Sequence, residues 1–335
     1  MEDLVETESR AMRRFECLFV VVCAVLSACG SAAVCPAGNE GLSIGSSAQW
    51  AEFAQAGCSS VPGELRISAP DLASMSAPSL QSVGSLAVVG SPSLASISLP
   101  ALTSVKGSLT IDADPLLSQV QLLGLQDVAG DLSVGAVNVA DLSLPSLQSV
   151  GGKLLLTNQG IGGSSLSSIE LPQLSTLGGE LDVLGQGQLR ALNLPALVSC
   201  AGFNLNLNAA LANVDFANLT TISGDVQVTQ DASLTDLELP VAASVDGSVT
   251  IREDGSLAAF SFPSLTTVKA ALVIDANDFL AAPSLPALAV IGTSLEVQFN
   301  RSLKPCVAQG IAARLTSAPP QVVLSQNLGS PDTCP

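Results

Sequence analysis

Apolar and polar residues alternate along this chain in short runs, and the runs recur every twenty-odd residues. The stretch SLPALTSVKGSLTI, residues 98–111, is one such unit. Its Leu109 and Ile111 alternate with Ser108 and Thr110, which is the period-two pattern of a strand with one buried face. Close copies of the unit begin at Ser143, Glu170, Glu238, Ser261 and Ser284.

The first apolar residue of each predicted main strand marks the repeat. Successive markers are separated by 21, 23, 23, 22, 27, 24, 21, 23, 23 and 23 residues. A period in the twenties indicates one structural unit stacked many times, each copy burying its apolar side against its neighbours. The markers are Leu65, Leu86, Leu109, Leu132, Leu154, Leu181, Leu205, Val226, Val249, Leu272 and Leu295.

A second short strand is predicted in each unit, just before a proline. In LASISLP, Ile97 and Leu99 point inward and Ser98 points outward. The proline stands at a strand end, where a missing N–H is tolerated. Short strands and tight bends in so few residues predict an all-β protein, a parallel β-solenoid of about eleven coils of about 23 residues. The prolines at this phase are Pro100, Pro145, Pro172, Pro195, Pro240, Pro263 and Pro286.

Both ends of such a rod need covers, because an open solenoid exposes apolar strand edges. At the first end a short lid helix is predicted, with Trp50, Phe53 and Ala54 on its apolar face. At the other end Pro305 begins a helix, and a last strand starts at Gln321. The remaining cap residues are Ser46 or Ser47 and Gly57 for the first helix, and the stripe Val307, Ile311 and Leu315 for the second.

The beginning of the chain has the features of an export signal. Arg10, Arg13 and Arg14 precede the apolar run of residues 17–28, which is too short for a spanning helix. The sequence LSAC resembles the bacterial lipobox, in which the cysteine, here Cys29, carries the lipid. An ordinary cleavable signal with a chance cysteine is the alternative, and Met12 is an alternative start. We therefore expect an exported protein of the cell envelope, an outer-membrane or cell-surface lipoprotein that contacts the membrane through its lipid only.

Cysteines bracket both predicted caps. In an exported protein this placement predicts two disulfides, Cys35 with Cys58 and Cys306 with Cys334. Zinc is the alternative for cysteine clusters, but the chain has no C-x-x-C spacing and no histidine. Cys200 stands where other units have valine, and we interpret it as a buried core thiol.

Composition narrows the possible functions. Only 12% of residues are charged and 47% are apolar, which excludes a disordered chain. Without residues 1–28, which contain five acids and three arginines, 24 acidic and 9 basic residues leave a net charge of −15. A body with this charge is a poor partner for nucleic acid. The lack of histidine and tyrosine also removes the commonest general bases, metal ligands and hydroxyl acids, and no cofactor motif is present.

Several stretches of the chain are similar to one known family. The segment from Cys35 through GCSSVPGELRI, the repeated LPxLxxVxGxLxI and the ending NRSLKPC with a later QN and Cys334 resemble the receptor L domain. The resemblance covers residues 35–335 and implies a right-handed, leucine-rich-repeat-like β-helix with a role in extracellular contact. The array is longer and more uniform than a receptor lobe, and no kinase or second span follows, so receptor signalling does not carry over. The chain therefore divides into a signal peptide (1–28), a lipidated tether (29–34), and one domain with N-cap 35–62, coils 63–304 and C-cap 305–335.

A polar side chain recurs three positions after the second apolar residue of the main strand. One interpretation is a row of calcium ligands, with Asp114, Asp231 and Asp254 as the acidic candidates. The other is a turn ladder in which each side chain accepts backbone N–H bonds at a corner. Mixed Ser, Gln and Asn favour the ladder over a metal site, because hard cations select acids. The row is Ser91, Asp114, Gln186, Asp231, Asp254, Asn277 and Asn300.

The outward side of the main strands is polar and nearly free of aromatic residues, so it is either a solvated sheet face or a partner surface. Our first functional hypothesis is a non-enzymatic surface lipoprotein, a rigid scaffold for binding or adhesion to proteins or envelope polysaccharides. The alternatives are a polysaccharide-degrading β-helix enzyme, since paired carboxylates hydrolyse glycosides, and a purely structural envelope spacer. The candidate binding residues are Glu180, Asp182, Asn204, Asn206, Asp225 and Gln227.

Overall fold

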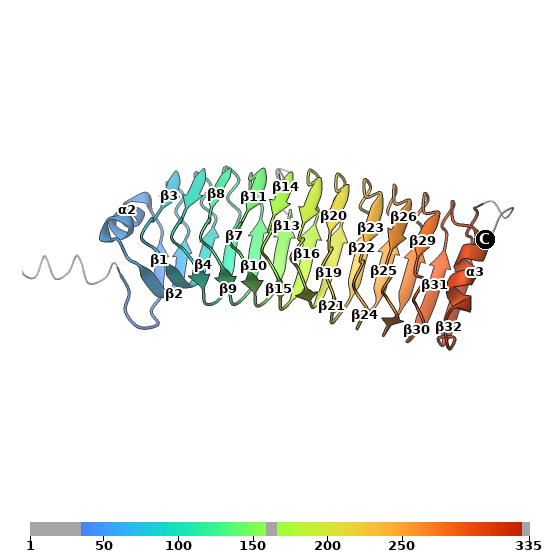
Figure 1. Cartoon of the computed structure of the whole chain (residues 1–335). Helices are drawn as coiled ribbons and strands as arrows, with labels where there is room; N and C mark the ends of the chain where they lie inside the picture. The colour runs from blue at the N-terminus through green and yellow to red at the C-terminus, as the bar shows by residue number, and fades with distance from the viewer. Residues whose placement is uncertain (1–34, 159–165, 330–335) are drawn as a thin grey trace, which may run out of the picture.

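The fold is an elongated rod built from one repeating coil (Figure 1). It is seen in a computed structural model that describes residues 35–158 and 166–329. Helix α2 (Ser47–Ala56) lies at one end and helix α3 (Pro305–Ala313) at the other. Neither helix, nor any other in the described ranges, is long and apolar enough to span a membrane. The predictions that concern residues 1–34, the signal, the tether and lipidated Cys29, lie outside the described part.

The main sheet is one parallel ladder in which each coil pairs with the next, so the predicted all-β parallel solenoid is confirmed. Its rungs along the chain are β1 (Leu42–Ile44), β2 (Ser60–Ile67), β4 (Ser82–Val89), β7 (Leu109–Asp112), β10 (Leu132–Gly135), β13 (Leu154–Thr157), β16 (Glu180–Leu184), β19 (Gly202–Asn206), β22 (Val226–Thr229), β25 (Val249–Arg252), β28 (Leu272–Asp275), β31 (Ser294–Gln298) and β32 (Gln321–Ser325). The predicted array spans β2 to β31, and the sheet extends it by one strand at each end. The strand predicted from Gln321 is β32.

The core follows from the alternation within these strands. Leu109 aligns with Leu132, which aligns with Leu154 and then Leu181, and all of these side chains are buried. The residues between them point outward, as period two requires. Stacking like residues coil upon coil buries a continuous row of leucine, valine and isoleucine, which is the main stabilising term for a solenoid.

The register corrects one marker. Leu181 pairs with Phe203, not with Leu205, and Phe203 in turn pairs with Val226. Leu205 is the second buried residue of its strand and lies beside Val183. The sequence-based alignment was wrong here because a buried phenylalanine stands where the other coils have leucine or valine, so the first leucine was taken for the start of the strand.

Short strands extend the main sheet at the corner before each of the main strands from β7 to β31. They are β6 (Ser104–Val105), β9 (Asp127–Val128), β12 (Ser149–Val150), β15 (Thr176–Leu177), β18 (Ser199–Cys200), β21 (Thr221–Ile222), β24 (Ser244–Val245), β27 (Thr267–Val268) and β30 (Val290–Ile291). Cys200 is buried in this row, as predicted, and burial raises the pKa of its thiol to about 12. A thiol with such a pKa is not a nucleophile at neutral pH.

The predicted second strands form the opposite wall, which we call the second face. Among the described strands they divide into three separate sheets. The first contains β3 (Ser74–Ser76), β5 (Ser96–Ser98) and β8 (Gln119–Gln121). The second contains β11 (Asp141–Ser143), β14 (Ser168–Glu170), β17 (Ala191–Asn193) and β20 (Asn213–Asp215), and the third contains β23 (Asp236–Glu238), β26 (Ala259–Ser261) and β29 (Ala282–Ser284).

The two interruptions follow the coils of β8 and β20, and both coils lack the proline found elsewhere at this phase. Leu123 and Ala217 occupy its position. Proline fixes φ near −65° and therefore restricts the chain at the end of the strand. The missing proline and the interrupted pairing thus coincide at both places.

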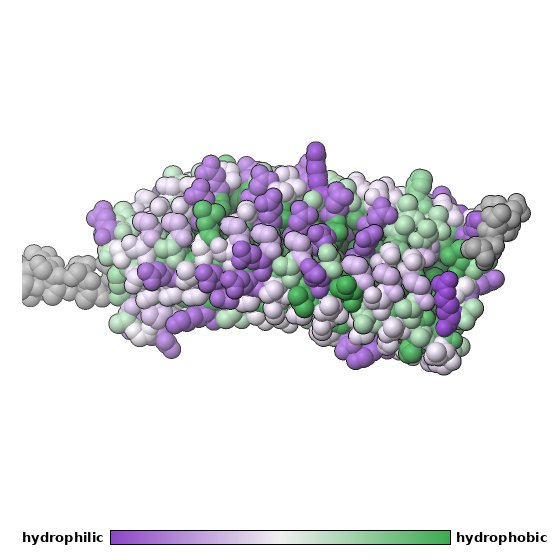
Figure 2. All heavy atoms as spheres, in the orientation of Figure 1, coloured by the Kyte–Doolittle hydropathy of each residue, from purple (hydrophilic) through white to green (hydrophobic). Residues whose placement is uncertain are grey.

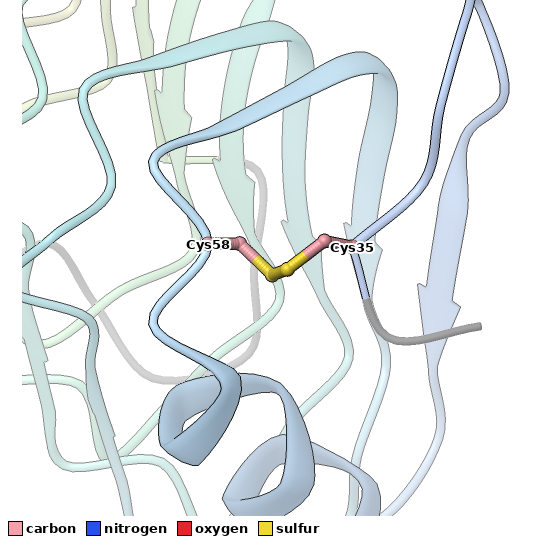
Figure 3. Close-up of a disulfide and its surroundings, with 2 residues drawn as sticks. All are labelled: Cys35 and Cys58. Carbon is pink, nitrogen blue, oxygen red and sulfur yellow. A yellow bond between two sulfur atoms is a disulfide. The ribbon is translucent and has the colours of Figure 1, made fainter. Parts of the chain in front are cut away.

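The first cap matches its prediction. Ser46 Oγ accepts the Gln49 N–H at 3.3 Å, and Gly57 ends α2 in the left-handed region. Trp50 and Phe53 are buried, with their ring centroids 5.3 Å apart. The predicted disulfide between Cys35 and Cys58 is present and ties the start of the described chain to the end of this cap (Figure 3).

The second cap differs from its prediction in one detail. Pro305 begins α3, which buries Ala308 and Ile311, while Val307 is partly buried against the core. Leu315 lies beyond the end of the helix and also packs partly against the core. Cys306 is disulfide-bonded, and its predicted partner Cys334 lies outside the described residues.

Candidate interaction surface and corner ladder

The candidate binding residues lie on the outer face of β16, β19 and β22. Asp182 pairs with Asn204, and Asn204 pairs with Gln227, so these three side chains form one row across the coils. In a second row, two residues earlier along each strand, Glu180 pairs with Gly202. Because Gly202 has no side chain, this row has a gap between Glu180 and Asp225. Asn206 lies beside Leu184, not beside Asp182 as the shifted alignment implied.

Lys153, on the preceding coil, faces this acidic group. Its Nζ forms an ion pair with Glu180 and lies 3.9 Å from an Asp182 oxygen. The hydrogen bond and charge of Glu180 raise the pKa of Lys153. Burial raises the pKa of Asp182, partly opposed by Lys153. One lysine therefore faces two carboxylates, and the surface keeps an excess of negative charge that extends to Asp225.

The side of the rod seen in Figure 2 is mostly hydrophilic, and hydrophobic residues form only separated patches on it. Exposed large apolar side chains do occur, and most lie at turns and corners, for example Leu116, Leu207 and Phe279, whereas Val290 and Val322 lie in strands β30 and β32. Isolated exposed apolar residues are normal for a folded protein. The surface offers polar contacts along the strands.

The recurring polar side chains form a hydrogen-bonded ladder just beyond the main strands. Gln186 and the other members are buried, and the side chains of Ser91, Asp114, Asn208, Asp231, Asp254, Asn277, Asn300 and Asn327 each accept the backbone N–H of the residue one coil earlier, as the turn-ladder interpretation expects. The bonds run from Ala69 N–H to Ser91 Oγ (3.0 Å), Ser91 to Asp114 Oδ1 (2.6 Å), Gln186 to Asn208 Oδ1 (3.0 Å), Asn208 to Asp231 Oδ1 (2.8 Å), Asp231 to Asp254 Oδ1 (2.9 Å), Asp254 to Asn277 Oδ1 (3.0 Å), Asn277 to Asn300 Oδ1 (3.0 Å) and Asn300 to Asn327 Oδ1 (3.3 Å).

Two members of this ladder, Asn208 and Asn327, were missed from the sequence. Asn208 was overlooked because its strand was aligned two residues late, so the position three residues after the second buried residue was misplaced. Asn327 belongs to the coil of β32, which lies beyond the predicted array. Counting three residues from Leu205 and from Leu324 finds both.

The residue before each ladder side chain has a positive φ. Leu207, Gln230 and Glu253 have φ values of 60°, 58° and 57°. This conformation is unfavourable for residues with a Cβ, so the corner must be stabilised by its hydrogen bonds. The same feature occurs at Gly90, Ala113, Gly185, Ala276, Phe299 and Gln326, and Ala136 shares the positive φ although the apolar Val137 follows it.

Burial acts strongly on the acidic ladder residues. It raises the pKa of Asp114 to about 6, of Asp231 to about 7 and of Asp254 to about 8. Within the described ranges, no three or more carboxylate, thiol or imidazole side chains converge in a way that would hold a metal ion. Each of these aspartates already uses Oδ1 to accept a backbone N–H, as a turn ladder requires.

A groove of about 240 Å³ lies at the interruption between β20 and β23. In neighbouring coils the corresponding backbone groups are bonded, for example Leu194 N–H to Asp215 C=O at 3.2 Å and Leu239 N–H to Ser261 C=O at 3.0 Å. The equivalent bond from Phe216 to Glu238 is not made. The groove is lined by Asn213, Val214, Asp215, Phe216, Asp236, Glu238 and Pro240, among others.

Comparisons with known proteins add little to this description. No protein-family model matches the chain, and no curated protein matches it. Among solved structures, the chain is similar to a leucine-rich repeat protein from Bacteroides ovatus. The two are 13% identical, the match covers 86% of this chain and 78% of that chain, and the TM-score is 0.43. The parallel strand register, not this match, establishes the solenoid.

Proposed function

We propose that this protein is an exported, non-enzymatic lipoprotein that acts as a rigid scaffold. The outer face of its main sheet, centred on Asp182, Asn204 and Gln227, contacts a partner protein or an envelope polymer. The single observation that carries the proposal is the in-register row of polar side chains on an uninterrupted parallel sheet. A stiff sheet holds such side chains at fixed spacing, so a partner contacts them without an ordering cost in the scaffold.

The charge of this face indicates the kind of partner. Glu180 and Asp182 lie close to Lys153, the one basic side chain in the outward rows of these strands, β13 to β22, as far as they are described, and Asp225 adds a further negative charge two coils beyond Glu180. Opposite charge across an interface accelerates association and disfavours wrong partners. We therefore expect a neutral or basic partner surface, with binding that weakens as ionic strength rises.

Export and anchoring belong to the same proposal. They rest on the signal-like run of residues 17–28, on the lipobox-like Cys29, and on a disulfide of the kind found in oxidising compartments. The likeness to receptor L domains supports a role in extracellular contact. Mass spectrometry of the mature N-terminus tests the anchor: a lipid on Cys29 supports it, and an unmodified product released into the medium contradicts it.

The binding face is tested by capture of partners from envelope extracts with the delipidated body. The variant combines Glu180→Gln and Asp225→Asn, and the matched control combines Asp236→Asn and Glu238→Gln on the second face. We expect the face variant to lose the captured partner and the control to retain it. Equal capture by both variants contradicts the proposed face, and no reproducible capture by any form supports a structural spacer instead.

The enzymatic alternative has its own test. The protein is incubated with pectin, alginate and glucan, and product release is measured. We expect none, because the candidate carboxylates lie on an open sheet face that does not exclude water. Turnover that disappears with Glu180→Ala or Asp182→Ala overturns the non-enzymatic assignment.

A further inference from the structure

The corner ladder contains both asparagine and aspartate, although the two side chains have different hydrogen-bonding capacity at neutral pH. An asparagine offers one acceptor oxygen and an N–H₂ donor, whereas an ionised aspartate only accepts. From Asn208 to Asn327 every position is buried, so each polar atom there needs a partner. The aspartates at 231 and 254 therefore require an explanation.

The asparagines show what the corner demands. Each one accepts a backbone N–H with Oδ1 and donates Nδ2 to a backbone carbonyl of the preceding coil. The acceptor is always the second buried residue of that coil's main strand. These bonds are Asn208 to Val183 (2.9 Å), Asn277 to Ile251 (2.9 Å), Asn300 to Ile274 (3.0 Å) and Asn327 to Val297 (2.8 Å).

The aspartates fulfil only the first of these two roles. Asp231 Oδ1 and Asp254 Oδ1 accept backbone N–H bonds, but Oδ2 of each is enclosed and has no hydrogen-bond partner. By the register of the ladder, the carbonyls equivalent to those that the asparagines use are those of Leu205 and Val228. An ionised Oδ2 cannot donate to a carbonyl, whereas a protonated one can.

We propose that Asp231 and Asp254 each hold a proton on Oδ2. Through it Asp231 donates a hydrogen bond to the carbonyl of Leu205, and Asp254 donates one to the carbonyl of Val228, so the stability of this part of the ladder depends on pH. A protonated aspartate then replaces an asparagine without loss of a hydrogen bond. Asp114 has the same unpartnered Oδ2 and would donate to Val88, in a separate short run of the ladder.

The charges around this pair favour the protonated form. Asp231 and Asp254 lie on adjacent coils and repel each other if both are ionised, and Glu253 precedes Asp254 at the corner. Glu253 itself accepts a bond from Gln230 at 2.7 Å. The nearby cation, Arg252, is paired with Asp275 at 2.7 Å. Asn208 donates toward Asp231 and partly offsets the effect of burial.

The consequence is a loss of stability as pH rises. The pKa values of both groups are raised on folding, to about 7 and about 8, above an unfolded value of about 3.9. Their contribution is therefore complete below the unfolded pKa and is lost as pH rises through the folded values. Each extra proton of the native state changes the unfolding constant tenfold per pH unit, so two protons give about a hundredfold change per unit between pH 5 and 6.5.

The test compares the natural chain with the double variant Asp231→Asn and Asp254→Asn, which supplies the donor at every pH. The unfolding equilibrium is measured from pH 5 to pH 9. We expect the slope of the logarithm of the unfolding constant against pH to be smaller by about two protons in the variant than in the natural chain. At pH 9 the variant should be the more stable protein. The matched control, Asp236→Asn on exposed β23, should follow the natural chain.

A second measurement does not depend on how well the variant folds. Infrared spectra of the natural chain at pH 6 should show the carbonyl band of buried carboxylic acids, and in the double variant this band should shrink to the contribution of Asp114, which is unchanged there. The proposal is overturned if that band is absent from the natural chain, or if the double variant keeps the full pH dependence.

Discussion

The main sheet runs without interruption from β1 to β32, whereas the second face is interrupted after β8 and after β20. Both walls consist of parallel strands from the same coils, so the difference lies in how each strand ends. Most main strands end in a corner where a buried polar side chain binds the preceding coil. Second-face strands have three residues and are followed at most phases by a proline. The continuous wall is thus the one whose corners are bonded from coil to coil at most positions.

The largest expected effect lies in the corner ladder. Asn277→Ala removes the acceptor of the Asp254 N–H and the donor to Ile251 C=O, both buried. Unsatisfied buried groups cost about 1–3 kcal/mol each, so we expect the free energy of unfolding to fall by about 3 kcal/mol. Asn213→Ala, at an exposed position of β20, should change it little. Denaturant unfolding measures both, and equal losses would contradict a special role for the corner.

Substitution of one valine in each wall allows a direct comparison of how tightly the main sheet and the second face are packed. Val183 is fully buried in the main sheet, whereas Val214 is only partly buried beside the groove at the interruption. Val183→Ala should cost about 2 kcal/mol, from lost transfer free energy and a residual cavity. Val214→Ala should cost about half as much, because water already reaches this site. Thermal unfolding of the two variants side by side checks the ratio, and a larger loss for Val214 would refute it.

The missing proline offers a gain-of-stability test. Ala217→Pro restores the residue that most coils have at this phase, at the loss of the Ala217 N–H bond to Asp215 Oδ1 (3.0 Å). Proline at a compatible position stabilises by about 0.4–1 kcal/mol through the unfolded state. We expect a gain within this range and slower hydrogen exchange of the β23 amides. Unchanged exchange would show that the proline does not control the pairing, and Leu123→Pro repeats the test at the other interruption.

The smallest effect is expected from an exposed ion pair at the bends that join β24 to β25 and β27 to β28. Lys269 Nζ lies 2.8 Å from Asp246 Oδ1, and both side chains are exposed to solvent. Pairs of this kind contribute about 0.2–1 kcal/mol and are screened by salt. A double-mutant cycle with Lys269→Ala and Asp246→Ala should give a coupling energy in that range, and it should vanish in 1 M salt. A larger coupling would mean that surface charges, and not only the corners, hold the main sheet together.

Much of the fold was predictable because the alternation is local. Leu109 and Ile111 determine which face of their strand is buried whatever lies above or below them, and Ser46 and Gly57 cap α2 through bonds to their own helix. The candidate surface was predictable only as a set of residues. Which of them are neighbours depends on the register, and a single phenylalanine at 203 was enough to shift it.

The amino-acid sequence by itself determined the coil, its period and its two caps, because these follow from residue spacing and from the conformational preferences of proline, glycine and β-branched residues. Only the tertiary structure decided which coils pair on the second face and which carbonyl each ladder side chain meets. Those contacts join residues about 23 positions apart, so they exist only once the coils are stacked. The chemical meaning of Asp231 and Asp254 belongs to this second group, because a carboxyl needs its proton only when packing has removed the water around it.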